Sequence, residues 1–213
     1  MVIAVIADIV GSRQLHDRAQ AQRAIEQVIT QVEDDFPLAR ESLAATVGDE
    51  LQGVYDNLGE AMASLLAIQL RLPENVALRF GLGIGEIREV ASAGGSLSDG
   101  PGWYAARDAI ETIDVRERTA PRMRTWIVGA PGQNAVMTSE IAVSNAYLLV
   151  RDELVGAMSD RERRLAYGRA LGASQEQLAT SEGIQQPSIS KSLRRSGAAA
   201  LLDGMALLQG EER

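Results

Sequence analysis

The stretch IAVIADIVGS, residues 3–12, is a run of apolar residues, many of them β-branched, interrupted by a single carboxylate at Asp8. A run of this kind is typical of a strand that is covered on both faces. The spacing of apolar residues further along predicts helices over 15–32 and 58–72 and strands over 43–47, 51–55 and 76–87. The order is β-α-β-β-α-β, which indicates an α+β fold with a ferredoxin-like sheet.

This topology is expected to bring two carboxylates together. In a ferredoxin-like sheet the first and third strands are antiparallel neighbours, so Asp8 at the end of the first lies beside Asp49, just before the third. Two carboxylates at that distance repel each other unless a cation or a shared proton offsets the repulsion. Because Mg²⁺ and Mn²⁺ prefer oxygen ligands, the sequence predicts a divalent metal site here. The alternative is that both are ordinary loop and turn residues.

Composition limits the function classes that the 213-residue chain can belong to. It has no cysteine and one histidine, His16, which excludes disulfides, thiolate metal sites and multi-histidine metal sites. No apolar run is long enough for a membrane span, and we expect a cytoplasmic protein. The net charge of −8 comes from the residues before 151, since 151–213 holds nine basic and nine acidic residues. Any DNA contact must therefore come from a local basic patch.

The chain after the first sheet is expected to contain a loop, a further helix and strand, and a long connecting helix. Gly, Ser and Asp dominate 91–102, which predicts a flexible loop that either cradles phosphate or simply connects, before a helix that starts at Pro101 or Gly102. A strand is expected over 124–129 and a helix over 134–158. The predicted division is a ferredoxin-like domain at 1–130, a connecting helix at 131–158 and a helical module at 159–213.

The segment SQEQLATSEGIQQPSISKSLRRSG (174–197) favours a helix-turn-helix. Ser174 and Gln177 form a potential capping box, and Gly183 suits a sharp turn between two helices. The outward side of the second helix would then carry short polar groups followed by cations, a pattern that suits DNA. The candidate DNA-binding residues are Gln185, Gln186, Ser188, Ser190, Lys191, Arg194 and Arg195. The alternative is an ordinary helical hairpin with a solvated basic face.

Four segments give the N-terminal part a family resemblance: ADIVGS, TVGDELQGVY, LRFGLGIGEI and PGWYAARDAI. Their order and spacing resemble those of class III nucleotidyl cyclases, over roughly residues 2–115. The resemblance implies that Asp8 and Asp49, with the backbone of Ile9, hold divalent metal, and that Arg107 stabilises the transition state. The nucleotide would contact Gly48 and Arg107. Trp103 and Tyr104 are candidates for stacking on a base, although aromatic residues at a helix start more often pack inside.

Two positions depart from the cyclase pattern. Family members usually have an asparagine where this chain has Trp103, and a purine-selecting lysine where it has Ala45. The metal pair is thus retained, while base selection and part of the transition-state clamp are not. The combination of a cyclase-like domain with a C-terminal helix-turn-helix resembles the bacterial SatD family.

These observations lead to three hypotheses. The leading one is a DNA-binding transcriptional regulator, a homodimer on double-stranded DNA, whose cyclase-like domain binds a purine nucleotide or related phosphate ligand with Mg²⁺ or Mn²⁺. The alternative is an enzyme, a divergent class III nucleotidyl cyclase or a nucleotide hydrolase. In the third, the cyclase fold is degenerate and serves only as a dimerisation platform.

Overall fold

The computed structural model describes residues 2–12, 17–46, 50–92 and 95–210. The strands within these ranges are β1 (Ile3–Ile9), β2 (Glu41–Ala45), β3 (Leu51–Tyr55), β4 (Leu78–Ile84), β5 (Arg88–Ser92), β6 (Gly95–Asp99) and β7 (Thr125–Gly129). The helices are α1 (Arg18–Asp35), α2 (Leu58–Arg71), α3 (Pro101–Arg116), α4 (Ala135–Ala157), α5 (Asp160–Ala170), α6 (Gln175–Glu182), α7 (Gln186–Arg195) and α8 (Ala198–Leu208).

β1 is the central strand of a five-stranded sheet with the order β2-β3-β1-β4-β7. It pairs antiparallel with β3 on one side and with β4 on the other, so that Ile3 lies opposite both Tyr55 and Ile84. β7 extends the sheet parallel to β4. The prediction that the first and third strands are antiparallel central neighbours is confirmed, and so is the α+β class.

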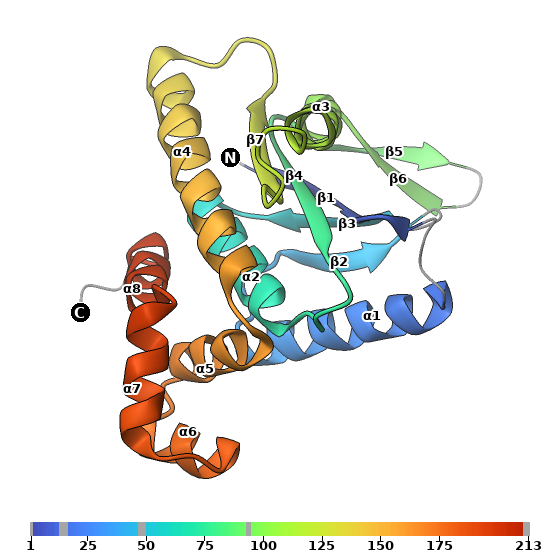
Figure 1. The fold of residues 1–213 in the computed structure, drawn as a ribbon. Helices are drawn as coiled ribbons and strands as arrows, with labels where there is room; N and C mark the ends of the chain where they lie inside the picture. The colour runs from blue at the N-terminus through green and yellow to red at the C-terminus, as the bar shows by residue number, and fades with distance from the viewer. Residues whose placement is uncertain (1, 13–16, 47–49, 93–94, 211–213) are drawn as a thin grey trace.

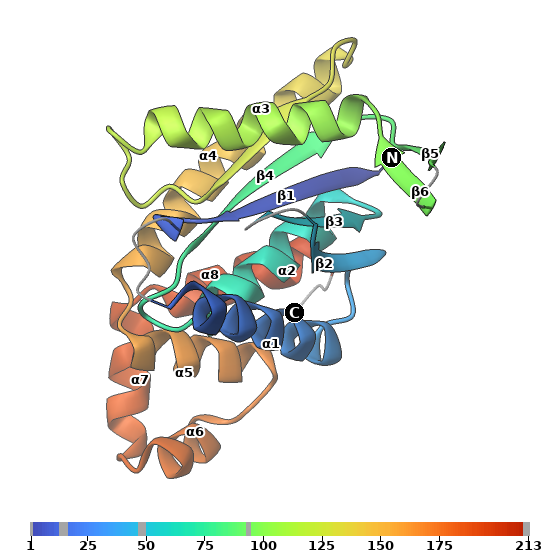
Figure 2. The ribbon, with the colours of Figure 1, turned by 90° about the vertical axis from the view of Figure 1, so that its right-hand side faces the viewer.

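Helices cover both faces of this sheet. α1 and α2 lie on one face, and α3 runs across the other face above β1 and β4 (Figure 2). Alternate side chains of β1 divide between the two sides. Ile3 and Val5 belong to the larger hydrophobic core that includes α1 and α2, whereas Ala4 and Ile6 pack with Trp103 of α3. Because both faces are covered, β1 is apolar from Ile3 to Ala7, as its sequence predicts.

Alternating glycines in and just after β4 allow α3 to lie very close to the sheet. A Cβ on Gly81 would lie 2.3 Å from the carbonyl oxygen of Ala106, and a Cβ on Gly83 would lie 1.9 Å from that of Gly102. Both distances are far below van der Waals contact, so the helix can pack at this height only over glycine.

α4 runs along the outer edge of β7 and satisfies its backbone. The side-chain amide of Asn145 accepts from the N–H of Ile127 and donates to its carbonyl, both at 2.9 Å. Two turns further along the helix, Asp152 Oδ2 accepts from the N–H groups of Arg124 and Thr125, both at 2.7 Å. These contacts replace the hydrogen bonds that a further strand would make.

The buried Asp152 is paired with an equally buried arginine from the same helix. Arg151 Nη2 lies 2.8 Å from Asp152 Oδ1, and both side chains are fully buried. Gln69 of α2 also donates a hydrogen bond to Asp152. Arg151 donates to the backbone carbonyl of Met62, which is likewise in α2. A buried ion pair of this kind is tolerated because its remaining donors and acceptors are hydrogen-bonded. It fixes α4 against α2 and β7.

α2 is buried on nearly all sides because it lies between the sheet and the C-terminal helices. α5 and α8 pack on its outer side, and α5 to α8 lie together below α4 (Figure 1). A Cβ on Gly59 would lie 2.2 Å from the carbonyl oxygen of Leu208, which shows how closely the end of α8 approaches α2. One hydrophobic core therefore continues from the sheet into the C-terminal helices.

The prediction of a flexible loop over 91–102 is wrong for most of this range, because the chain forms two strands there. β5 and β6 form an antiparallel hairpin in which Arg88 lies opposite Asp99. α3 then begins at Pro101, as predicted, after Gly100 with φ of 134°. β6 is not recognisable in the sequence because it has no β-branched or aromatic residue and contains glycine and aspartate, which are depleted in strands.

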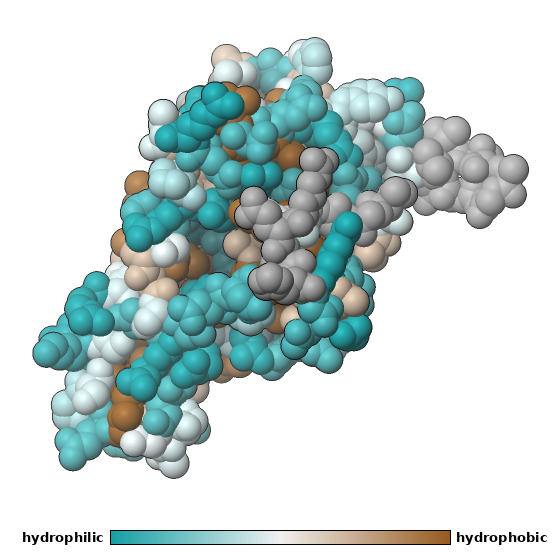
Figure 3. Space-filling model, turned by 45° about the vertical axis from the view of Figure 1, so that its right-hand side comes forward, coloured by the Kyte–Doolittle hydropathy of each residue, from teal (hydrophilic) through white to brown (hydrophobic). Residues whose placement is uncertain are grey.

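The surface is mainly polar on the face that Figure 3 shows. Hydrophilic residues cover most of the described surface there, and hydrophobic residues form small, separate patches. Among the described residues, none of the helices combines the length and the apolar character that crossing a membrane requires.

Candidate functional site

Asp8 lies near the end of β1, directly opposite Arg79 of β4. Its Oδ2 atom is 3.6 Å from Arg79 Nη1, and its side chain is 29% exposed. The next residue, Ile9, is buried and lies opposite Leu78. β1 thus delivers a partly exposed carboxylate, with a cation beside it, to this end of the sheet.

Arg79 connects Asp8 to the carboxyl-terminal end of α3. Its guanidinium donates to both carboxylate oxygens of Glu117, at 3.1 and 2.6 Å, and lies 3.2 Å from Asp114. The hydrogen bond to Glu117, followed by the nearby carboxylates, raises the pKa of Arg79 above its ordinary value. Glu117 also accepts from Arg124 at 2.9 Å. Asp8 is therefore one member of a network of alternating charges.

Arg107 of α3 reaches the same end of the sheet. It pairs with Glu50, with Nη1 2.5 Å from Oε2 and Nη2 donating to Oε1 at 2.8 Å. This hydrogen bond raises the pKa of Arg107, and the charges of Glu50, Glu111 and Asp8 contribute in the same direction. The Arg107 side chain is 46% exposed. Its guanidinium is therefore accessible to solvent, although Nη1 and Nη2 are already paired with the Glu50 carboxylate.

The predicted site is only partly within the described residues. Gly48 and Asp49 lie outside them, so the expected meeting of Asp8 with Asp49 stays a prediction. No group of three or more His, Cys, Asp or Glu side chains suited to a metal occurs in the part of the chain that the structure describes. What the structure places here is Asp8, whose partly exposed carboxylate is a hard oxygen ligand of the kind Mg²⁺ and Mn²⁺ prefer.

The two aromatic residues at the start of α3 have different surroundings. Trp103 is buried, and its indole N–H donates to Ser98 Oγ at 2.8 Å. Tyr104 is 60% exposed and donates to Asp99 at 2.7 Å. Of this pair, Tyr104 is the ring that a ligand can reach without repacking.

Three charged residues of this site were not among those expected from the sequence: Glu50, Arg79 and Glu117. Glu50 follows Asp49 directly, and Arg79 lies within LRFGLGIGEI, so both were inside segments that resemble the cyclases. Strand register could have paired Arg79 with Asp8. Glu117 follows α3 and carries no recognisable local signal.

Comparison with known protein families identifies the family of this chain. The SatD family matches residues 2–204. The chain belongs to the SatD family. This confirms the resemblance inferred from the whole chain. Comparison with curated proteins finds no match.

Solved structures similar to this SatD family member are nucleotidyl cyclase domains at low identity. A bacterial light-regulated adenylyl cyclase is 12% identical with a TM-score of 0.44, covering 59% of this chain and 74% of the other. The guanylate cyclase domain of RhGC from Catenaria anguillulae, in complex with GTP, is 16% identical with a TM-score of 0.40 over 52% and 72%. The adenylyl cyclase CyaB from P. aeruginosa is 9% identical with a TM-score of 0.37 over 55% and 81%.

The C-terminal helices have the local features expected for 174–197. The capping box of Ser174 and Gln177 is present, and Gly183 has φ of 66° at the turn between α6 and α7. Ile189 and Leu193 are buried. The candidate DNA-binding residues follow from the N-cap of α7 to its last turn, and apart from the half-buried Ser190 they are exposed: Gln185, Gln186, Ser188, Lys191, Arg194 and Arg195.

The hypothesis of a DNA-binding transcriptional regulator is nevertheless wrong. The solved structures similar to this SatD family member are adenylyl and guanylyl cyclase domains, and the family match runs from residue 2 to residue 204 and so includes α7. Arg195 also has an internal partner, because its Nη2 donates to Glu162 at 3.1 Å. The residues that were expected to bind DNA thus have no supported role in DNA binding.

Proposed function

We propose that this SatD family member is a divergent nucleotidyl cyclase-like enzyme that binds a purine nucleoside triphosphate with Mg²⁺ or Mn²⁺ at the end of β1 and the start of β3. In this proposal Asp8 and Asp49, with the backbone of Ile9, hold the metal. Arg107 contacts phosphate, and Gly48 and Tyr104 line the nucleotide site.

The contact between Arg107 and Glu50 is the observation that supports this proposal most directly. Arg107 belongs to α3, and Glu50 is adjacent in sequence to Asp49. The ion pair therefore joins residues that are 57 positions apart and holds the guanidinium at the residue that follows the proposed second metal ligand in the sequence. The charge of Asp8 also acts on Arg107. A cation fixed beside two carboxylates is the arrangement that a metal-bound triphosphate needs.

The chain's own residues have separable tasks in this proposal. Arg107 would exchange Glu50 for a phosphate oxygen, because a guanidinium binds phosphate in the same two-pronged way as a carboxylate. Glu50 would then compete with the ligand for Arg107. Arg79 would keep the Asp8 carboxylate in place from the opposite strand. When bound, a divalent ion would neutralise the negative charge that triphosphate and carboxylates bring together.

The proposal predicts binding that depends on both metal and carboxylate. Thermal-shift titrations with ATP and with GTP, each with Mg²⁺ or Mn²⁺, should raise the melting temperature of the wild-type chain. A ligand at 100 times its dissociation constant stabilises a protein by about 2.7 kcal/mol. Asp8→Asn and Arg107→Ala should each lose this shift, whereas Arg88→Ala, at an exposed position in β5, should keep it. An equal shift in Asp8→Asn would contradict the site.

Turnover separates an enzyme from a binding module. The products to measure are cyclic nucleotide with pyrophosphate, for cyclisation, and nucleoside diphosphate with phosphate, for hydrolysis. Glu50→Gln offers a sharper test than a loss of function, because it removes the competitor of Arg107 and should tighten triphosphate binding. If the triphosphate binds but no product forms, the hypothesis of an enzyme is rejected, and nucleotide binding remains as the function of the domain.

We also propose a homodimer, with residues 1–130, 131–158 and 159–213 as cyclase-like domain, connecting helix and helix-turn-helix module. Three valines of α4 recur every seventh residue and are exposed: Val136, Val143 and Val150. β-branched residues at this spacing favour pairing of two helices. Sedimentation analysis should give a dimer for the wild type and a monomer for Val143→Glu. In this arrangement the C-terminal helices pack on α2 and stabilise the cyclase-like domain.

A further inference from the structure

We infer that a cavity between α2, α4 and α5 is a binding site for a small oxyanion, such as phosphate or a small phosphate monoester. The cavity is distinct from the end of the sheet where Asp8 and Arg107 lie. Its volume is about 190 Å³, which corresponds to roughly six water molecules. This space suits an ion and is below the usual range of pockets for drug-sized ligands. A nucleotide is therefore too large for it.

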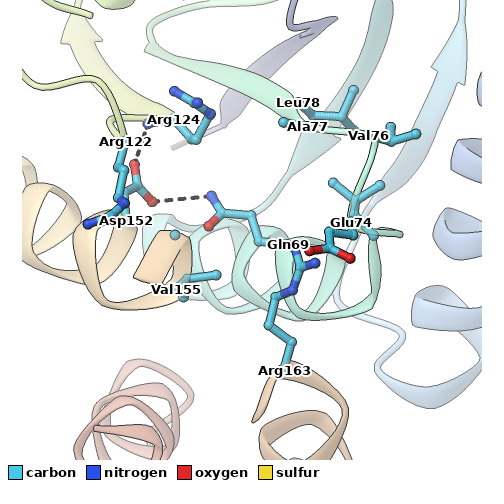
Figure 4. Close-up of a pocket in the computed structure, with 12 residues that line it drawn as sticks. Gln69, Glu74, Val76, Ala77, Leu78, Arg122, Arg124, Asp152, Val155 and Arg163 are labelled. Carbon is cyan, nitrogen blue, oxygen red and sulfur yellow. Dashed lines mark hydrogen bonds between the residues drawn. The ribbon is translucent and has the colours of Figure 1, made fainter. Parts of the chain in front are cut away.

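Arginines from two parts of the chain supply positive charge to the cavity. Arg122 and Arg124 come from the segment before β7, and Arg163 comes from α5. Figure 4 shows Arg163 extending from α5 towards Gln69 and Glu74. Arg124 is largely engaged elsewhere, because its guanidinium donates to Glu117 and to two backbone carbonyls. Arg122 and Arg163 are therefore the cations that a ligand would meet.

Arg163 has an unused hydrogen-bond donor. One of its terminal nitrogens pairs with Asp160, but its Nε is buried and has no partner among the described residues. Its side chain is 15% exposed. A buried donor without an acceptor is unfavourable, and an oxyanion in the cavity would supply that acceptor with charge assistance. Arg122 pairs with Glu153 at the exposed side and can turn towards the same ligand.

The acidic residues of the cavity do not cancel this preference. Asp152 is already satisfied by the backbone of β7 and by the buried Arg151, so its charge is balanced within the protein. Glu74 is exposed. Apolar side chains also line the cavity: Leu72, Val76, Leu78 and Val155. An anion would thus be held by guanidinium groups and shielded from solvent by aliphatic groups.

Titration with inorganic phosphate at constant ionic strength tests the site. The melting temperature of the wild-type chain should rise and saturate at millimolar phosphate, and ³¹P resonances should broaden on binding. Arg163→Gln and Arg122→Gln should each weaken binding by about tenfold or more. Arg161→Gln is the matched control, since it removes the same charge from the same helix at a position that is not part of the cavity. It should bind phosphate like the wild type.

One further variant and a second ligand keep the test decisive. Arg107→Ala should retain the phosphate response, which distinguishes this cavity from the proposed nucleotide site. If Arg163→Gln proves unfolded by circular dichroism, Arg122→Gln tests the cavity by itself, since its side chain is half exposed. Methyl phosphate in place of phosphate separates a monoester from the free ion as the preferred ligand. A wild-type chain that shows no saturable response to either anion would overturn the inference, as would equal loss in Arg161→Gln.

Discussion

Asp8 and Arg79 face each other across β1 and β4, with the carboxylate Oδ2 3.6 Å from the guanidinium Nη1. The guanidinium also holds Glu117 through two hydrogen bonds. The Arg79 side chain thereby connects the central strand of the sheet to the end of α3. A residue that was expected only as a metal ligand is thus also part of the charge network that positions this helix.

Replacing Arg79 by methionine should destabilise the protein by about 1.5–3 kcal/mol, because hydrogen bonds to charged groups are lost at a mostly buried position. Urea unfolding measures the difference. The control is Arg88→Met, which removes an exposed pair with Glu86 and should change the free energy of unfolding by about 0–1 kcal/mol. Equal effects in the two variants would show that the network contributes little.

Gly83→Ala should prevent the close packing of α3 on β4. The added methyl group would lie 1.9 Å from the carbonyl oxygen of Gly102, which is backbone and cannot rotate away. We expect a loss of about 3 kcal/mol or more, at the upper end of overpacking costs. Gly204→Ala in α8 is the control, since its nearest neighbour would be Tyr147 at 3.5 Å. That variant should be neutral or slightly more stable in thermal unfolding.

Asn145→Ala should leave the backbone N–H and carbonyl of Ile127 without their partners. Each unsatisfied buried group costs about 1–3 kcal/mol, so a loss of about 2–6 kcal/mol is expected in chemical denaturation. Ser139→Ala, at an exposed position of the same helix, should have little effect. Hydrogen exchange provides a second measurement, because the amide of Ile127 should exchange faster in Asn145→Ala. Unchanged protection there would contradict the role given to Asn145.

Glu162 should make stability depend on pH. Its pKa is lowered first by the hydrogen bond from the backbone N–H of Ser159, and further by the Ser159 hydroxyl and by Arg195. A carboxyl whose pKa is lower in the folded state stabilises the protein above its unfolded pKa, which is about 4.3. That contribution disappears as the pH falls through the folded value. Melting temperatures of wild type and Glu162→Gln should therefore differ at pH 7, and the difference should shrink progressively as the pH falls below about 4.3.

The regular part of the fold could be predicted from the sequence because each element has a strong local pattern. β1, β4 and the start of α3 follow directly from apolar runs, glycine spacing and Pro101. The β5–β6 hairpin could not be predicted, since its Gly and Ser residues carry no strand pattern. It is recognisable only from the pairing of its backbone.

The candidate site was predictable only in part. The sequence pattern indicates where its residues lie within strands and helices, but not which side chains meet. The location of Asp8 at a strand end follows from periodicity. The ion pair of Arg107 with Glu50 joins residues 57 positions apart, and no local pattern encodes such a contact. The cations of the cavity are equally dispersed, since Arg122 and Arg163 belong to different elements that meet only in the folded chain.

The contacts that Asn145 and Asp152 make with β7 have a consequence for how chains can aggregate. An exposed edge strand is a template on which another chain can form a continuing sheet. On the β7 flank that template is already occupied by side chains of α4. The opposite flank ends in β2, which is five residues long and irregularly paired between Glu41 and Ala44. Short, irregular and charged edges resist intermolecular pairing. Loss of Asn145 would therefore threaten solubility as well as folding.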